Sequence, residues 1–225
     1  MKIPFLLFST FSLFYYSIWS QILPSDLQWN ENETGYYAIK GNNIVLVSVT
    51  GEEDNTILSS NELGEISVEA FIFSKTKNKI LLFTNAKKVW RYETRGDYFV
   101  FDLKQKELIK IGKKFPKSSL MFAKFSNDEK SIAYVVKEDL NNILRNGSTA
   151  SNIFIEDLEK GIIKKLTSSE GNQKLINGTF DWVYEEEFSC RDGFMFNESG
   201  NKIAFWQVDA SAVKDFYMIN TTDSI

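Results

Sequence analysis

Hydrophobic residues recur in short runs along most of the chain, and polar turns separate the runs. From Gly35 onward the runs are rich in β-branched and aromatic residues, a pattern typical of β-strands. The predicted strands are Ile44–Val49, Val68–Phe73, Ile80–Phe83, Tyr98–Phe101, Met121–Phe125, Ile132–Val136, Ile153–Ile155 and Ile203–Val208. Glycines lie in the connections between them. Because helical periodicity is not sustained after the first twenty residues, we expect an all-β fold.

The predicted strands also form a repeat. A Phe–Ser or Phe–Asn pair, a polar turn and a hydrophobic strand occur in copies that begin at Phe73, Phe125 and Phe196. A second hairpin follows the first two copies, and the segment 216–220 is a candidate for the third. Four short strands per unit at a period of about 50 residues are typical of β-propeller blades. We therefore predict about three to four blades of four-stranded antiparallel sheet, with another all-β stack, such as a sandwich, as the alternative.

The first twenty residues differ in character from the rest of the chain. Lys2 is the only charged residue before Asp26, and residues 3–19 are almost continuously apolar. A positive start followed by an apolar run is typical of a secretory signal peptide, and the run is also long enough for a single membrane anchor. Under either interpretation of residues 1–20, we expect residues 21–225 to be exported to the periplasm, the cell surface or the medium.

Composition narrows the classes of function. Hydrophobic residues make up 43% of the chain, which is enough for a sizeable core. The net charge is −4 and the lysines are scattered, so we expect no nucleic-acid partner. A single cysteine, Cys190, allows no internal disulfide, and the chain contains no histidine. We therefore expect neither a metal site nor another cofactor.

The segment Asp181–Glu187 reads Asp-Trp-Val-Tyr-Glu-Glu-Glu and ends in three consecutive carboxylates. Adjacent carboxylates repel one another, so they require water, a basic side chain or a cationic ligand nearby. The α-amino group of a peptide, with a reference pKa of about 8, is such a ligand. A solvated acidic turn fits the residues equally well. We expect Asp181 to cap or brace the turn, and Trp182 and Tyr184 to support it by packing.

This segment resembles the glutamate motif of dipeptidyl peptidase IV and its relatives in the prolyl oligopeptidase group of serine peptidases. The flanking segments that look like the bacterial members are 177–180, 191–194, 203–209 and 215–220. The resemblance is dense from Phe180 onward and can be traced back to about Val68. It implies an eight-bladed propeller joined to an α/β-hydrolase domain, which together remove N-terminal dipeptides with proline or alanine in second place.

The resemblance also implies a substrate-binding site. Glu186 and Glu187 match the pair that, in relatives, binds the free α-ammonium group of the substrate. Arg91 falls where the family has an arginine that donates to the carbonyl of the substrate's N-terminal residue, although a surface arginine in a strand fits its short motif too. Two carboxylates offer charge-assisted acceptors to an ammonium group. Glu185 is expected to be a helper or a solvent-facing member of the run.

Catalytic residues are not expected in this chain. In the family, the resemblance places a Ser-Asp-His triad in the hydrolase domain, with the serine in a G-x-S-x-G turn. No two glycines here stand four positions apart, and without histidine no serine has its usual base. The site is thus expected to recognise substrate and not to cleave it.

Taken together, these patterns predict the exported N-terminal propeller portion of a dipeptidyl peptidase IV-like serine peptidase, ending before the hydrolase domain. The expected partners are a peptide with a free N terminus, the C-terminal α/β-hydrolase domain of the full-length protein, and a second copy of that protein. The alternative is a non-catalytic propeller that binds peptides or proteins. Residues 137–151 are longer than the hairpin usual at this place in the family, and their function stays open.

Overall fold

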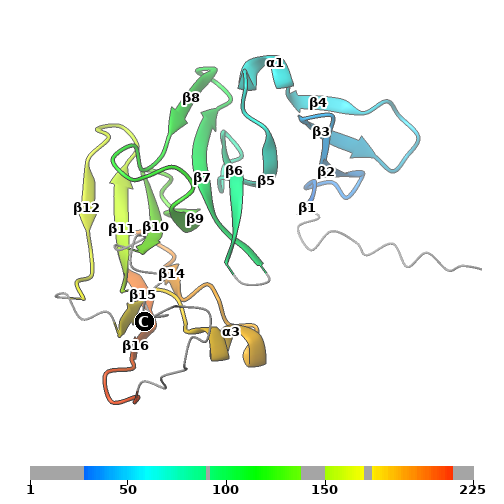
Figure 1. Ribbon diagram of the computed structural model, residues 1–225. Helices are drawn as coiled ribbons and strands as arrows, with labels where there is room; N and C mark the ends of the chain where they lie inside the picture. Colours follow the sequence, from blue (N-terminus) through cyan, green and yellow to red (C-terminus); the bar gives the residue numbers. More distant parts are fainter. Residues whose placement is uncertain (1–27, 90–91, 138–149, 170–173, 215–225) are drawn as a thin grey trace, which may run out of the picture.

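The computed structural model describes residues 28–89, 92–137, 150–169 and 174–214, most of which lie in antiparallel β-strands (Figure 1). The first sheet is four-stranded and follows chain order. Its strands are β1 (Gln28–Trp29), β2 (Gly35–Lys40), β3 (Asn43–Ser48) and β4 (Asn55–Leu58). A single helical turn, α1 (Ser60–Leu63), leads from this sheet to the next.

The second sheet contains two four-stranded antiparallel units. They are β5 (Val68–Phe73), β6 (Lys79–Val89), β7 (Tyr92–Asp102) and β8 (Glu107–Lys110), then β9 (Leu120–Phe125), β10 (Ser131–Lys137), β11 (Ser151–Asp157) and β12 (Ile163–Lys165). A short pairing of β7 with β9, at Arg95↔Met121 and Gly96↔Leu120, joins the two units. Each unit has the four strands that the repeat predicts.

The C-terminal part of the described chain is less regular. It contains β13 (Leu175–Asn177), α3 (Trp182–Phe188), β14 (Phe194–Phe196), β15 (Ile203–Phe205) and β16 (Gln207–Asp209). Strand β13 pairs in parallel with β11 and antiparallel with β16. Strands β14 and β15 form a separate two-stranded hairpin. No helix in the described part of the chain is long and apolar enough to span a bilayer.

Side-chain alternation explains how the sheets stack. On β6, Ile80 and Leu82 pack with Ile44 of the first sheet, whereas Leu81 belongs to a second cluster with Tyr134 of β10. The same alternation on β10 turns Ala133 and Val135 toward Phe194 of β14. Because both faces are covered there, the segments Ile80–Phe83 of β6 and Ile132–Val136 of β10 are hydrophobic without interruption. Complete burial of one large hydrophobic side chain, such as Ile80 or Leu82, stabilises the folded state by about 1.5–3 kcal/mol. The sheets follow one another from β1–β4, blue and cyan, to β14–β16, orange and red (Figure 1).

The predicted all-β architecture is confirmed as a mostly β fold of antiparallel sheets, with two local differences. The segment Ile203–Val208 is not one strand, because it is divided between β15 and β16 at Trp206, whose N–H donates to the Gly193 carbonyl at 2.8 Å. The third copy of the repeat forms the predicted hairpin, as β14 and β15. The acidic segment is a helix and not a turn. The predicted signal at residues 1–20, residues 138–149 and the segment 216–220 lie outside the described residues.

Candidate functional site

The acidic motif lies on α3, a helix of two turns that is capped at both ends. At the N-terminus, Asp181 Oδ1 accepts hydrogen bonds from the N–H groups of Val183 at 2.9 Å and Tyr184 at 3.0 Å. At the C-terminus, Ser189 adopts a left-handed conformation with φ 55° and ψ 24°, which ends the helix. The prediction that Asp181 caps this segment is confirmed. What it caps is a helix, because its carboxylate satisfies N–H groups that a helix start leaves unpaired.

Aromatic rings follow one side of α3. Phe180 and Tyr184 stack with ring centroids 5.9 Å apart, and Tyr184 and Phe188 lie 5.5 Å apart. Trp206, which lies between β15 and β16, packs against Phe180 with ring centroids 6.1 Å apart. Spacing by four residues places these side chains on one helix face, so Tyr184 does pack as predicted, although 45% of it stays exposed. The side chain of Trp182 lies outside what the structure describes.

The three consecutive glutamates have different surroundings. Glu187 is exposed, and Glu185 and Glu186 are partly buried. Glu185 Oε1 is fully enclosed and has no hydrogen-bond partner among the described residues. Burial raises the pKa of the Glu185 carboxyl above its ordinary value; Arg191 and Lys137 oppose this rise in pKa, and Glu186 adds to it. The carboxyl group of Glu185 is therefore partly enclosed, whereas that of Glu187 is open to solvent.

Two basic residues behind α3 were not singled out by the sequence. Burial lowers the pKa of the Lys137 ammonium at the end of β10; Arg95 of β7 lowers this pKa further, and Glu185 raises it. Lys137 thus experiences the charges of both β7 and α3. Arg95 Nε is buried and, like Glu185 Oε1, has no hydrogen-bond partner among the described residues. Nothing in the local sequence distinguishes these two residues from ordinary strand cations, since only the fold brings them near the helix.

Arg91, the third predicted site residue, lies outside the described residues, so the structure brings together only Glu186 and Glu187 of the predicted set. Both lie on α3, on successive positions of one helix. Strand β7, whose first described residue is Tyr92, begins directly after Arg91 in the sequence.

The loop after α3 is fixed to the sheet by polar contacts. Lys124 of β9 donates to both carboxylate oxygens of Asp192 and to the Phe194 carbonyl, each at 2.6 Å. The Thr179 hydroxyl donates to the Arg191 carbonyl at 2.7 Å. A Cβ atom at Gly193 would lie 2.9 Å from the Gly178 carbonyl carbon, so only glycine permits this close approach. These contacts hold both ends of the segment that carries α3.

The segment before α3 is anchored through Asn177, a fully buried residue at the end of β13. Its side-chain Nδ2 donates to the Ser151 carbonyl and to Asn152 Oδ1, each at 3.2 Å. Its Oδ1 accepts from Gln207 Nε2 at 2.7 Å.

Within the described residues no group of three or more His, Cys, Asp or Glu side chains could hold a metal ion.

Comparison with known proteins identifies the family. Residues 74–224, about two thirds of the chain, match the family model described as the dipeptidyl peptidase IV (DPP IV) N-terminal region. The chain belongs to this family. The sequence resemblance at Asp181–Glu187 therefore lies within a family-wide match and is not an isolated motif.

Several relatives of the dipeptidyl peptidase IV family are similar to most of this chain. Dipeptidyl aminopeptidase B of Saccharomyces cerevisiae is 29% identical over 205 residues, which cover 85% of this chain and 23% of the yeast protein. Prolyl endopeptidase FAP of Homo sapiens is 24% identical over 178 residues, covering 79% of this chain and 21% of the human protein. The chain thus spans between a fifth and a quarter of the length of these relatives.

The crystal structure of Porphyromonas gingivalis dipeptidyl peptidase 4 has a similar fold. It matches with a TM-score of 0.60 and 22% sequence identity, over 75% of this chain and 23% of that one. The mostly β arrangement described above therefore corresponds to the fold of a dipeptidyl peptidase IV N-terminal region.

Proposed function

We propose that this chain is the substrate-recognition part of a dipeptidyl peptidase IV-like serine peptidase of the bacterial type. It binds the free N terminus of a peptide, and a hydrolase domain elsewhere in the full-length protein releases the N-terminal dipeptide, with proline or alanine in second place. The observation that carries this proposal is the capped helix α3, which carries Glu186 and Glu187 between two anchored loops, within a chain of the dipeptidyl peptidase IV N-terminal family.

The binding group is the α-ammonium of the peptide, held by Glu186 and Glu187. An ammonium group has three donors and one charge, so two carboxylates can accept from it together. Each charge-assisted hydrogen bond contributes about 1.5–3 kcal/mol. An internal or acetylated peptide lacks the charge and these donors. Recognition through Glu186 and Glu187 therefore selects peptide N termini.

Glu185 supports this pair without binding the ligand. Its enclosed carboxyl group lies near Lys137 and Arg191, whose charges lower its pKa against the effect of burial. Because Glu185 is enclosed, the ligand binds to the other two glutamates, the exposed Glu187 and the partly buried Glu186. Arg91 contributes a donor to the first carbonyl of the peptide, as the family resemblance implies. The full-length protein is exported through residues 1–20, as a cleaved signal or a retained anchor, and pairs with a second copy.

Peptide binding tests the proposal. The ligands are a peptide beginning Gly-Pro and the same peptide with an acetylated N terminus, titrated calorimetrically into the 225-residue chain. We expect the free peptide to bind at least about tenfold more tightly, equivalent to about 1.4 kcal/mol. The variants Glu186→Gln and Glu187→Gln, combined, should abolish this preference. Glu159→Gln, an exposed glutamate in the turn after β11, is the matched control and should keep it.

An unchanged preference in the double variant would show that the glutamate pair is not the ammonium site. Cleavage of a Gly-Pro chromogenic substrate by the full-length protein separates the two functional classes. Cleavage that is lost in the double variant supports the peptidase. A full-length protein that binds free N termini but releases no dipeptide would instead be a non-catalytic peptide-binding module.

A further inference from the structure

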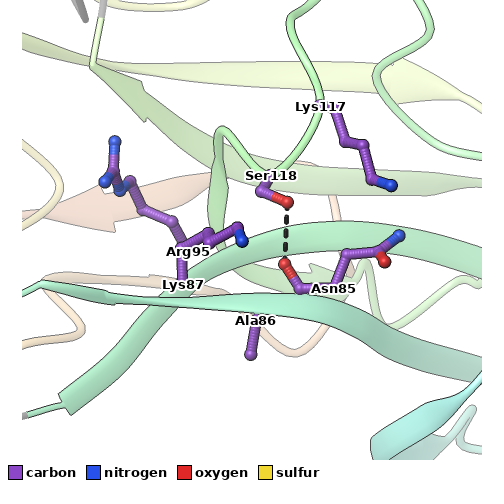
Figure 2. Close-up of a pocket in the computed structure, with 6 residues that line it drawn as sticks. All are labelled: Asn85, Ala86, Lys87, Arg95, Lys117 and Ser118. Atoms are coloured by element: carbon purple, nitrogen blue, oxygen red, sulfur yellow. Dashed lines mark hydrogen bonds between the residues drawn. The ribbon is translucent and has the colours of Figure 1, made fainter.

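A basic cavity lies beside the β6–β7 hairpin, and none of its lining residues belongs to α3. It has a volume of about 400 Å³ and is lined by Asn85, Ala86, Lys87, Arg95, Lys117 and Ser118. The first three residues belong to β6, Arg95 belongs to β7, and the last two precede β9. Figure 2 shows Lys117 on one side of the Ser118–Asn85 hydrogen bond and Arg95 with Lys87 on the other. Three of the six lining residues are cationic, and none is acidic.

The walls of the cavity are fixed by a network behind it. The Ser118 hydroxyl donates to the Asn85 carbonyl at 2.7 Å. The buried Asp97 carboxylate accepts from the Asn85 side-chain amide at 2.8 Å and from the Ser118 N–H at 3.0 Å. Strand β6 changes register between Thr84 and Lys87, so a β-bulge shapes this edge of the cavity. The cavity is therefore a built feature of the fold and not a gap between flexible side chains.

Two carboxylates, Asp97 and Glu69, accept hydrogen bonds from residues of the cavity wall. Asp97 is held by Asn85 and Ser118, and Lys110 Nζ lies 3.8 Å from its Oδ1. Glu69 Oε1 accepts from the Ala86 N–H at 2.8 Å. Neither acidic residue lines the cavity. The positive charge that faces the cavity is thus left to be balanced by solvent or by a ligand.

Within the part of the chain that the structure describes, Lys87, Arg95 and Lys117 form no salt bridge. Arg95 is partly buried, and among the described residues its Nε–H has no acceptor, which is unfavourable for a buried donor. Lys137 lies near enough to Arg95 for the two charges to repel. Like charges collected at one cavity favour an anion there.

We propose that this cavity binds the carboxylate side chain of an aspartate or glutamate in a peptide. The planar guanidinium of Arg95 suits a carboxylate, and the two lysines supply point charges at the rim. The choice of a peptide as the source of the carboxylate rests on the proposed function, whereas the choice of an anion does not. Lys137, which senses both Arg95 and Glu185, places the cavity on the side of the molecule where α3 lies.

Nuclear magnetic resonance titration of the 225-residue chain tests this site. The probe is an acetylated and amidated pentapeptide with a central glutamate, compared with the same peptide containing glutamine. Because acetylation removes the α-ammonium, Glu186 and Glu187 contribute nothing, and the result is independent of the ammonium site. We expect the amide signals of Asn85, Lys87 and Ser118 to shift. The glutamate peptide should bind about tenfold more tightly than the glutamine peptide, and added salt should weaken its binding.

Matched variants assign the effect to the cavity. Arg95→Gln should reduce affinity for the glutamate peptide about tenfold. The double variant Lys87→Gln with Lys117→Gln alters only exposed side chains, so it provides a second test that does not disturb folding, with a similar loss expected. Lys164→Gln, an exposed lysine on β12, removes the same charge elsewhere and should leave affinity within about twofold.

Equal binding of the two peptides, or unchanged affinity in both cavity variants, would overturn the proposal. Inorganic phosphate is titrated as a third ligand, beside the two peptides. If phosphate at the same concentration shifted the same amides as strongly as the glutamate peptide, the cavity would be a site for free anions, and its assignment to acidic peptides would be wrong.

Discussion

The cap of α3 offers a direct test of how the glutamate pair is held. Replacing Asp181 with alanine removes the acceptor for the N–H groups of Val183 and Tyr184 and leaves all three glutamates in place. Replacing it with asparagine keeps a side-chain oxygen there and removes only the charge. We expect the alanine variant to loosen α3 and the asparagine variant to behave nearly as the wild type.

The magnitude follows from the geometry of the cap. Loss of a capping aspartate costs about 1 kcal/mol, within a range of about 0.5–2 kcal/mol. A helix of seven residues has little stability of its own, so the loss falls on local opening of α3. When the free energy of opening α3 falls by about 1 kcal/mol, the open population becomes about fivefold larger. At the other end, Ser189→Gly removes the strain of a left-handed non-glycine residue, about 1 kcal/mol, and should offset the alanine variant.

Amide hydrogen exchange measures this local opening. The informative amides are Glu185, which donates to the Asp181 carbonyl at 3.1 Å, and Cys190, which donates to the Tyr184 carbonyl at 3.2 Å. Both should exchange about fivefold faster in Asp181→Ala. Both should return to the wild-type rate when Ser189→Gly is added. Amides of β10, such as that of Ala133, report on the core and should not change.

Two results would refute this reasoning. If the alanine variant exchanged at the wild-type rate, the two hydrogen bonds of the cap would carry no weight in the stability of α3. If the asparagine variant exchanged as fast as the alanine variant, the charge of Asp181 and not its acceptor geometry would stabilise the helix.

Two further predictions concern stability. Burial raises the pKa of Glu156 in the folded state, so the folded protein binds a proton more readily than the unfolded chain, and this group lowers stability as pH rises through that pKa. Glu156→Gln keeps a side-chain oxygen that accepts from the Gly112 N–H and the Tyr134 hydroxyl. It should raise the free energy of unfolding, measured in urea, by about 1 kcal/mol near pH 8. If this gain did not shrink toward pH 4.5, ionisation of Glu156 would not be its cause. Gly96→Ala would press a Cβ into the Phe83 ring and to 2.7 Å from the Thr84 carbonyl oxygen; we expect a loss of about 1–3 kcal/mol by the same measurement, and wild-type stability would disprove the clash.

The sequence predicted the strands where burial decides them. Strand β5 begins and ends at the predicted residues, because Val68 and Phe71 pack against residues of β6 and of the first sheet. Strands β6 and β7 run several residues beyond their predicted ends. Their outer halves are polar, and pairing of the two backbones, not burial, continues them. Such a continuation leaves no hydrophobic pattern in the sequence.

The site was predicted in part for the same physical reason. The motif at Glu185–Glu187 could be located from residue order, but two helical turns are too short to show a period. The helix depends on two local details, the Asp181 cap and the left-handed Ser189. The charges around Lys137 and the basic cavity come from residues distant in sequence, which only the paired strands and the β6 bulge bring together.

Asn177 lies at the junction between β13 and the segment that leads to α3, so the direction of α3 depends on how β13 aligns with β11. The parallel pairing of β11 with β13 is recorded at a single residue pair, Ser151↔Ile176, and the side chains of Ser151 and Asn177 supply much of the remaining attachment. The helix starts five residues after Asn177. A slip of β13 along β11 would therefore shift the point at which α3 begins and redirect its carboxylates. Strand alignment at this junction thus helps to set the direction in which Glu186 and Glu187 point.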